Sequence, residues 1–312
     1  MTVVVPFSPR DVFLNRVAAG SAVLNGAGEM IGITAINEWG VIETPIFLTS
    51  SMAIGRVYDA AVETLVERIP EAGVVDALMP VVTECDDGYL NTSRMVQVEP
   101  ADVRAALEDA RGSEAGAPAG GVVGAGIGMV GFELKGGIGN ASREVNGYCL
   151  GVLALTNFGR IERLTIDGVP VGAALVDEGW PSRNDRERGS CIVLIATDAP
   201  LLPHQLARLA RRAGLGLARV GSTGGNGSGE IFVAISTTVR NQRGGLPLVA
   251  TTHLSDEGLD PFFAAAVEAT EEAVVDSLFV ADTVVGRDGH VAAGLPIGRT
   301  LELLAAAGRI AG

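Results

Sequence analysis

Residues 186–200 read Arg186-Glu-Arg-Gly-Ser190-Cys-Ile-Val-Leu-Ile-Ala-Thr-Asp-Ala-Pro200, a charged loop that passes through a Gly-Ser step into an apolar, β-branched segment. Such a segment predicts a buried strand, with Ser190 at its start and at the mouth of the loop. If the Gly189–Ser190 peptide bond were cut, Ser190 would carry a free α-amine with an unperturbed pKa of about 8. That amine could act as the base for the hydroxyl of the same residue. Taken alone, the pair also fits an incidental loop-to-strand junction, because Gly-Ser pairs are common in turns.

Further stretches of the chain share one family pattern. They are Gly189–Arg219, Asn226-Gly-Ser-Gly-Glu-Ile-Phe-Val-Ala-Ile-Ser-Thr237, Lys135-Gly-Gly-Ile-Gly-Asn-Ala-Ser-Arg143, Gly151-Val-Leu-Ala-Leu-Thr-Asn157, Leu24-Asn-Gly26, Glu43-Thr-Pro45 and Glu84-Cys-Asp-Asp-Gly-Tyr-Leu-Asn91. Through them the chain resembles the β-aminopeptidase family, the L-aminopeptidase/D-Ala-esterase/amidases among the self-processing N-terminal-nucleophile hydrolases. The resemblance implies a single domain with the fold of a four-layer α/β/β/α sandwich. It also implies that the chain cuts itself into an α part, residues 1–189, and a β part, residues 190–312.

Three polar residues are the predicted companions of Ser190. Ser228 and Glu230 lie two apart on an extended segment, so their side chains point to the same side. The resemblance implies that they complete the catalytic network of the nucleophile, although they also fit the end of a Gly-rich turn. Asn157 ends a strand-like run, where a side-chain amide can donate to a developing oxyanion. It matches the oxyanion asparagine of the family, and an asparagine at a strand-to-turn junction is the alternative.

The loop from Glu84 to Asn91 is the predicted substrate-binding segment. A carboxylate at the rim of a pocket would pair with the free amine that an aminopeptidase recognises. By resemblance we expect Glu84 to bind that ammonium and Tyr89 to lie at the substrate. Asp86 stands where the family often carries an aromatic residue, which points to an altered substrate preference. A solvated acidic turn is the alternative for this loop.

Composition limits the classes of partner. The 312 residues are 47% hydrophobic and 19% charged, as expected for a globular chain with a large core. A formal net charge of −14 argues against nucleic acid or an anionic membrane as a partner. No long apolar run predicts a membrane span, and residues 1–16 lack the features of a signal peptide. Three cysteines without a CxxC pair, Cys85, Cys149 and Cys191, favour a reducing compartment, so we expect a cytoplasmic protein.

Other kinds of site are disfavoured. Gly126-Ile-Gly-Met-Val-Gly131 fits G-x-G-x-x-G, but a dinucleotide site needs a helix opening on the motif, and a strand and a turn are predicted there. We interpret these glycines as allowing close sheet packing beside the active site. His204, His253 and His290 are isolated, so the sequence indicates neither a Ser-His-Asp triad nor a metal site. We expect no metal and no cofactor.

Hydrophobic periodicity and turn residues place the elements along the chain. Strands are predicted at 21–24, 31–36, 42–48, 81–83, 122–123, 129–135, 148–156 and 230–237, with a small hairpin over 161–164 and 169–175. Helices are predicted at 57–68, 101–111, 203–214, 264–276 and 301–310, with Gly214 as the C-cap of the third. Residues 177–188 are predicted to form a surface linker.

The prediction for function is a serine aminopeptidase or amidase. Ser190 would attack the carbonyl of a short peptide, amide or ester with a free N-terminus, and water would release the acyl-enzyme. The resemblance implies a homo-oligomer of αβ units. Two alternatives remain open at this point: a processing-silent relative that serves as a binding or structural module, and an acyltransferase in which an amine replaces water.

Overall fold

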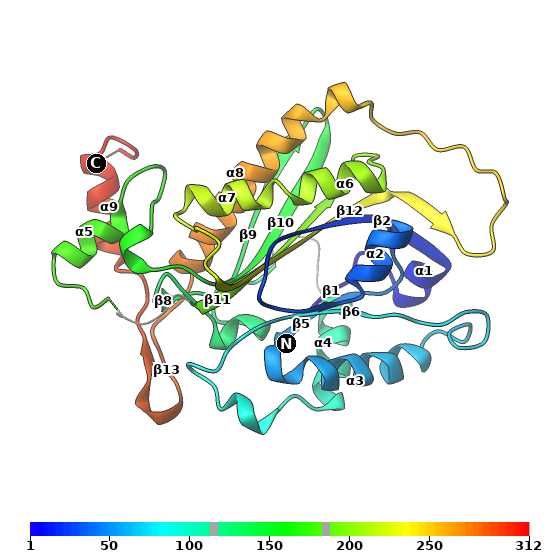
Figure 1. Ribbon diagram of the computed structural model, residues 1–312, viewed down its shortest axis with the longest axis horizontal. Coiled ribbons are helices and arrows are strands. Elements are labelled where there is room, and N and C mark those ends of the chain that lie inside the picture. The colour runs from blue at the N-terminus through cyan, green and yellow to red at the C-terminus, as the bar shows by residue number, and fades with distance from the viewer. Residues whose placement is uncertain (113–117, 183–187, 312) are drawn as a thin grey trace.

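The computed structural model describes residues 1–112, 118–182 and 188–311 (Figure 1). Its centre is a six-stranded sheet with the strand order β4-β2-β12-β11-β10-β9. The strands are β4 (Val41–Ile42), β2 (Asn15–Gly26), β12 (Gly227–Gln242), β11 (Arg188–Thr197), β10 (Tyr148–Asn157) and β9 (Ile138–Val145). Strands β11 and β12 are parallel, and the other neighbours are antiparallel.

A four-stranded sheet packs against the first one. Its order is β1-β5-β6-β3, and its strands are β1 (Thr2–Val4), β5 (Ile46–Ser50), β6 (Val81–Cys85) and β3 (Met30–Ile31). Alternate residues of β11 show why this strand is apolar throughout. Ile192 and Leu194 belong to the core between the two sheets, whereas Cys191, Val193 and Ile195 belong to the core under the helices. A strand buried on both faces reads as a continuous hydrophobic run.

Helices cover the outer face of each sheet (Figure 1). α6 (Pro203–Ala210), α7 (Ala213–Arg219) and α8 (Asp260–Phe279) pack on the six-stranded sheet, and α3 (Ile54–Val66) and α4 (Pro100–Gly112) pack on the four-stranded one. Two glycines allow a close approach of helix to sheet: a Cβ on Gly20 would lie 2.2 Å from Ala207 N, and one on Gly139 would lie 1.8 Å from Ala273 O. The predicted four-layer α/β/β/α sandwich is therefore confirmed.

The remaining elements are short. They are the helices α1 (Pro9–Leu14), α2 (Ile33–Trp39), α5 (Val171–Asp177) and α9 (Ile297–Ala306), and the hairpins β7 (Val130–Gly131) with β8 (Leu134–Lys135) and β13 (Val284–Val285) with β14 (Val291–Ala292). Six short 3-10 helices lie in the described residues: η1 (Ser51–Ala53), η2 (Ser93–Met95), η3 (Gly124–Gly128), η4 (Ile161–Arg163), η5 (Asp256–Gly258) and η6 (Arg287–Gly289).

Several predicted elements were wrong in type or extent. The predicted strand 31–36 is mostly α2, which lies between Gly32 and Gly40, both in the left-handed region with φ of 95° and 68°. These glycines turn the chain into and out of a helix in spite of its β-branched residues. The predicted strand 42–48 is divided between the two sheets, as β4 and β5. The predicted strand 129–135 is the β7–β8 hairpin, whose turn residues Phe132 and Glu133 have positive φ.

Three further predictions fail for similar local reasons. The predicted hairpin over 161–175 is η4 followed by α5, because Gly172 packs against the carbonyl of Ile161, only 1.7 Å from where a Cβ would stand. Gly214 is not a C-cap, since the predicted helix ends at Ala210 and Gly214 lies inside α7. Residues 122–123 form no strand, and β9 was not predicted. Part of the predicted linker 177–188 lies outside the described residues.

Candidate active site

Ser190 lies where three strands of the large sheet meet. It is the third residue of β11, and its side chain is 3% exposed. On one side it pairs with Asn157, the last residue of β10, and on the other with Gly229, near the start of β12. The sheet therefore gathers the ends of β10, β11 and β12 around the Gly189–Ser190 peptide bond.

The Ser190 hydroxyl points between the two sheets, as the alternation with Ile192 and Leu194 indicates. It is buried, and no contact to it among the described residues has the geometry of a full hydrogen bond. The thiol of Cys85, at the end of β6 in the opposite sheet, is its neighbour. Burial raises the pKa of that thiol well above its usual value, and the Ser190 hydroxyl offsets part of the rise. The thiol thus stays neutral beside the serine hydroxyl.

Asn157 faces the same side of the sheet as Ser190. Directly opposed residues of an antiparallel pair have Cβ atoms about 4.5–5.5 Å apart. Asn157 Oδ1 accepts a hydrogen bond from Val130 N at 3.0 Å, and its Nδ2 donates to Asp86 O at 2.8 Å. A backbone N–H requires an acceptor and a carbonyl requires a donor, so these partners fix the orientation of the amide. A side-chain amide has two N–H donors, and the second has no acceptor among the described residues.

Ser228 and Glu230 are buried beside the strand partner of Ser190. The Ser228 hydroxyl donates to Glu230 Oε1, so the two side chains meet, as their spacing predicts. Regular alternation along β12 directs them to the face of Phe232, which packs under the helices. In the continuous chain they therefore flank the backbone of Ser190 rather than its hydroxyl.

Glu84 reaches the loop that passes over Gly229. Its Oε1 accepts from Glu29 N at 2.8 Å, and its Oε2 accepts from the Ser51 hydroxyl. A Cβ on Gly28 would lie 3.2 Å from Glu84 Oε1 and 3.6 Å from the Cα of Gly229. Burial is the largest cause of the raised pKa of Glu84, and the hydrogen bonds from Ser51 and Glu29 oppose it. A buried carboxylate with a raised pKa, directly before the Cys85 that neighbours Ser190, is a candidate for binding a cation.

Tyr89 is tied to a different element. Its ring stacks on His290, with centroids 4.8 Å apart and planes at 10°, and its hydroxyl donates to Val291 O at 3.1 Å. His290 Nδ1 lies 2.8 Å from Tyr89 O. The tyrosine therefore connects the 84–91 loop to the β13–β14 hairpin, and its hydroxyl is already used there.

Sequence reasoning gave no role to four residues around this site. Asn25 donates through Nδ2 to Gly225 O at 2.7 Å and to Ser228 O, which fixes the turn before β12. Lys135 is fully buried at the end of the β7–β8 hairpin. Cys85 and Ser51 become neighbours of Ser190 and Glu84 only through the packing of the two sheets. Asn25 and Lys135 stand inside the quoted motifs, and those motifs were the only signal that could have found them.

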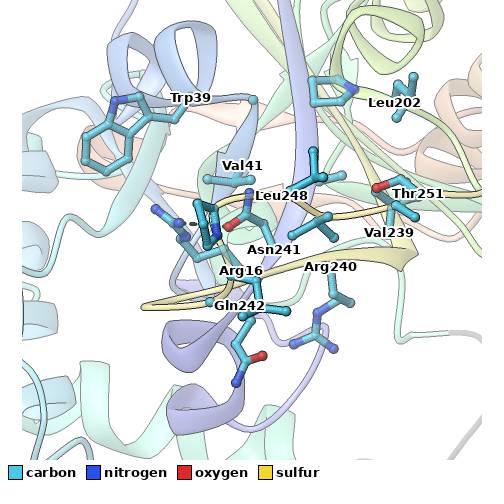
Figure 2. Close-up of a pocket in the computed structure, with 18 of the residues that line it drawn as sticks. Arg16, Trp39, Val41, Leu202, Val239, Arg240, Asn241, Gln242, Leu248 and Thr251 are labelled. Atoms are coloured by element: carbon cyan, nitrogen blue, oxygen red, sulfur yellow. Dashed lines mark hydrogen bonds between the residues drawn. The ribbon is translucent and has the colours of Figure 1, made fainter.

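Two cavities lie at different distances from Ser190 and the 84–91 loop. The larger, about 900 Å³, lies at the far end of β12 from Ser228 and is lined by Trp39, Arg240 and Leu248 among others (Figure 2). The smaller, about 390 Å³, is lined by Ser50, Asp87 and Asn91 and opens beside the 84–91 loop. Glu84 does not line it, but Thr49, its strand partner on β5, does.

The G-x-G-x-x-G stretch forms η3 and β7 in place of a strand–helix turn. A Cβ on Gly126 would lie 2.4 Å from Gly121 O, so the glycines permit close packing next to Asn157, as interpreted. Within the described ranges, no three His, Cys, Asp or Glu side chains are grouped to hold a metal ion. In the same ranges, every helix is too short or too polar to span a bilayer.

Comparisons with known proteins agree on one family. Residues 1–292 match peptidase family S58. The chain is 39% identical over 300 residues to the β-peptidyl aminopeptidase BapA of Sphingosinicella xenopeptidilytica, covering 91% of this chain and 74% of that protein. The homologous enzyme of Sphingosinicella microcystinivorans is 40% identical over 298 residues, covering 90% and 74%.

Solved structures give the same result. The PH0078 protein from Pyrococcus horikoshii OT3 superposes with a TM-score of 0.91 at 42% identity, covering 99% of this chain and 85% of that one. A Burkholderia sp. β-aminopeptidase gives 0.89 at 39% identity, covering 98% and 86%. The L-aminopeptidase D-Ala-esterase/amidase of Ochrobactrum anthropi, a serine aminopeptidase with a variant Ntn-hydrolase fold, gives 0.86 at 37%, covering 95% and 83%. The chain therefore belongs to peptidase family S58, as a serine aminopeptidase of the N-terminal-nucleophile type.

Proposed function

We propose that the chain cleaves itself between Gly189 and Ser190 and then uses Ser190 to release N-terminal residues from short peptides, amides or esters. The observation that carries this proposal is the buried Ser190 hydroxyl, which has only the neutral Cys85 thiol as a side-chain neighbour and is set directly opposite Asn157 in the sheet. The names of the Sphingosinicella and Burkholderia relatives support a substrate with a free amine.

Self-cleavage needs only the atoms of the Gly189–Ser190 step and water. Ser190 Oγ bonds to the carbonyl carbon of Gly189 as the peptide C–N bond breaks, and the hydroxyl proton passes to the Ser190 nitrogen. Water then hydrolyses the resulting ester, which leaves a carboxylate on Gly189 and a free amine on Ser190. A Cβ at residue 189 would lie 2.1 Å from Asn157 O, so glycine is required where the scissile bond packs on β10.

In the mature enzyme each residue has one task. The Ser190 amine takes the proton of its own hydroxyl, which then attacks the substrate carbonyl. The second N–H of Asn157 donates to the oxyanion, a contribution typically worth about 3–4 kcal/mol. Once the chain is cut, the Ser190 nitrogen can turn toward the face where Ser228 and Glu230 lie, and these residues orient the amine.

Substrate recognition falls to the 84–91 loop. Glu84 accepts the substrate ammonium, which shares the carboxylate with Ser51 and Glu29 N. Tyr89 acts indirectly, because it fixes the loop on the β13–β14 hairpin. The family membership disfavours a processing-silent binding module. Acyl transfer remains a second outcome of the same acyl-enzyme, and it would yield aminolysis products in place of hydrolysis products.

We also propose a cytoplasmic homo-oligomer of αβ units without metal or cofactor. Leu246, Leu248 and Val249 are 78%, 88% and 68% exposed on the segment that borders the larger cavity (Figure 2). A contiguous exposed apolar patch is typical of an interaction surface, and a second copy of the chain is the occupant that we propose. The cysteine usage described above supports a reducing compartment.

Intact-mass analysis of freshly purified protein beside Ser190→Ala tests the proposal. We expect wild type to give two chains, residues 1–189 and 190–312, and the variant to give one. Ser190→Cys is the matched control, because a thiol is also a nucleophile and should still allow cleavage. A wild-type protein that stays a single 312-residue chain under native conditions would leave Ser190 without its amine, and the proposal would fail.

A further inference from the structure

Lys135 is a buried lysine with no acidic partner among the described residues. Its Nζ donates to three backbone carbonyls, those of Gly126 at 2.9 Å, Met129 at 2.8 Å and Gly136 at 2.5 Å. An ammonium has three N–H donors, so these carbonyls use all of them. Burial lowers the pKa of Lys135 to about 8, and no charged neighbour contributes to the shift.

The three carbonyls explain why a cation is buried here. Burying a charge without a counter-charge costs free energy, which the three charge-assisted hydrogen bonds oppose. Gly126 O and Met129 O also accept backbone N–H groups, from Met129 at 3.2 Å and from Gly136 at 3.3 Å, whereas Gly136 O relies on the ammonium. The ammonium thus holds the Gly-rich segment 124–137 folded upon itself.

This segment also contacts the end of β10. Val130, directly after Met129, donates from its N–H to Asn157 Oδ1 at 3.0 Å, and Phe132 N donates to Phe158 O at 2.7 Å. The contact from Val130 decides which atom of the Asn157 amide faces the segment. The Nδ2 atom is thereby turned toward Asp86 O.

We propose that Lys135 is a positioning residue for the aminopeptidase reaction. Its ammonium gathers the carbonyls of segment 124–137, holds Val130 against Asn157, and so orients the amide that donates to the oxyanion. Lys135 is fully buried and acts through these residues rather than on the substrate. The inference rests on the proposed role of Asn157.

The first test replaces the ammonium by a neutral side chain of similar length, Lys135→Met. We expect kcat to fall about tenfold to hundredfold, less than the ~10²–10³-fold loss typical of removing an oxyanion donor, while KM stays within about twofold. Val74→Ala, 82% exposed and outside both the site and segment 124–137, is the control and should leave kcat unchanged. All rates are normalised to the processed fraction measured by mass.

A double-mutant cycle distinguishes the positioning role of Lys135 from the proposed oxyanion role of Asn157. If Lys135 acts through Asn157, adding Lys135→Met to Asn157→Ala should cost no further activity. Losses that multiply would overturn the inference and leave the role of Asn157 standing. An Asn157→Ala enzyme with unchanged kcat would instead refute the proposed oxyanion role itself.

The pH profile gives a readout that a merely structural role of Lys135 would not change. Measured at saturating substrate between about pH 6 and 10, kcat should rise as the Ser190 amine loses its proton. It should fall again as the pH passes the value of about 8 at which Lys135 loses its own proton. Saturation matters because titration of the free substrate amine affects kcat/KM only. Lys135→Met should lack this fall, and a fall that the variant keeps unchanged would overturn the inference.

Discussion

Glu84 combines its proposed binding role with a cost in stability. The carboxylate is buried, and burial is the main reason that its pKa lies above the ordinary 4.5. An acid whose pKa is raised in the folded state holds its proton to a higher pH there than in the unfolded chain. The free energy of unfolding therefore decreases as the pH rises from about 4.5 through the raised pKa. Such a cost is expected where a charge is kept out of water for a ligand.

Glu84→Gln should separate these two effects. We expect KM for substrates with a free amine to rise about tenfold or more, since hydrogen bonds to charged groups contribute about 1.5–3 kcal/mol. The same variant should melt at a higher temperature than wild type at pH 7, and the difference should vanish near pH 4. Steady-state kinetics and thermal melts at both pH values measure this.

Glu29→Gln, which removes a nearby exposed charge, is the control and should not raise KM. A lower melting temperature for Glu84→Gln than for wild type at pH 7 would contradict the argument.

At the scale of single elements, the sequence predicted best the parts that are apolar on both faces or strongly amphipathic. The strand after Ser190 and the helices α3, α4 and α8 were all found, because their burial pattern follows one period. The strand prediction for 31–36 was wrong because Gly32 and Gly40, both in the left-handed region, set the start and end of helix α2. Residue propensities do not predict such φ angles. The Ser228–Glu230 contact followed from their spacing, whereas Cys85 and Lys135 join the site through sheet packing and carbonyl geometry.

The junction of β10 and β11 gives a test at the same scale. A Cβ on Gly189 would lie 2.1 Å from Asn157 O and 2.8 Å from the Cα of Phe158, both backbone atoms that cannot move alone. We expect Gly189→Ala to push β11 away from β10, to slow or abolish self-cleavage, and to lower the free energy of unfolding by about 1–3 kcal/mol. Gly151→Ala, on β10 with nothing within 4 Å of the new Cβ, should process normally. Equal processing of both variants by intact mass would contradict this account.

In the whole molecule, the two parts that cleavage would create are interleaved. β11 from Ser190 onward and all of β12 belong to residues 190–312, yet in the large sheet they lie between β2 and β10 of residues 1–189. The core between the sheets is likewise shared: Ile192 and Val233 pack with Ile46 and Val81. Neither part can complete the six-stranded sheet or the core between the sheets alone, which is why self-cleavage can expose a new amine without separating the chains.

The cleaved protein should therefore behave as one folding unit. We expect the two chains to elute together in native size-exclusion chromatography and to separate only in denaturant, within a single unfolding transition. Residues 190–312 expressed alone should not fold, because β11 would lack β10 and β12 would lack β2 as neighbours, leaving open edges and an uncovered apolar face. Light scattering on the same column tests the oligomer: a native mass of at least twice 32.0 kDa supports it, and Leu248→Asp should lower that mass. A fragment that shows a cooperative melt by itself would mean that the chain holds two independent domains, and the single-domain account would have to be given up.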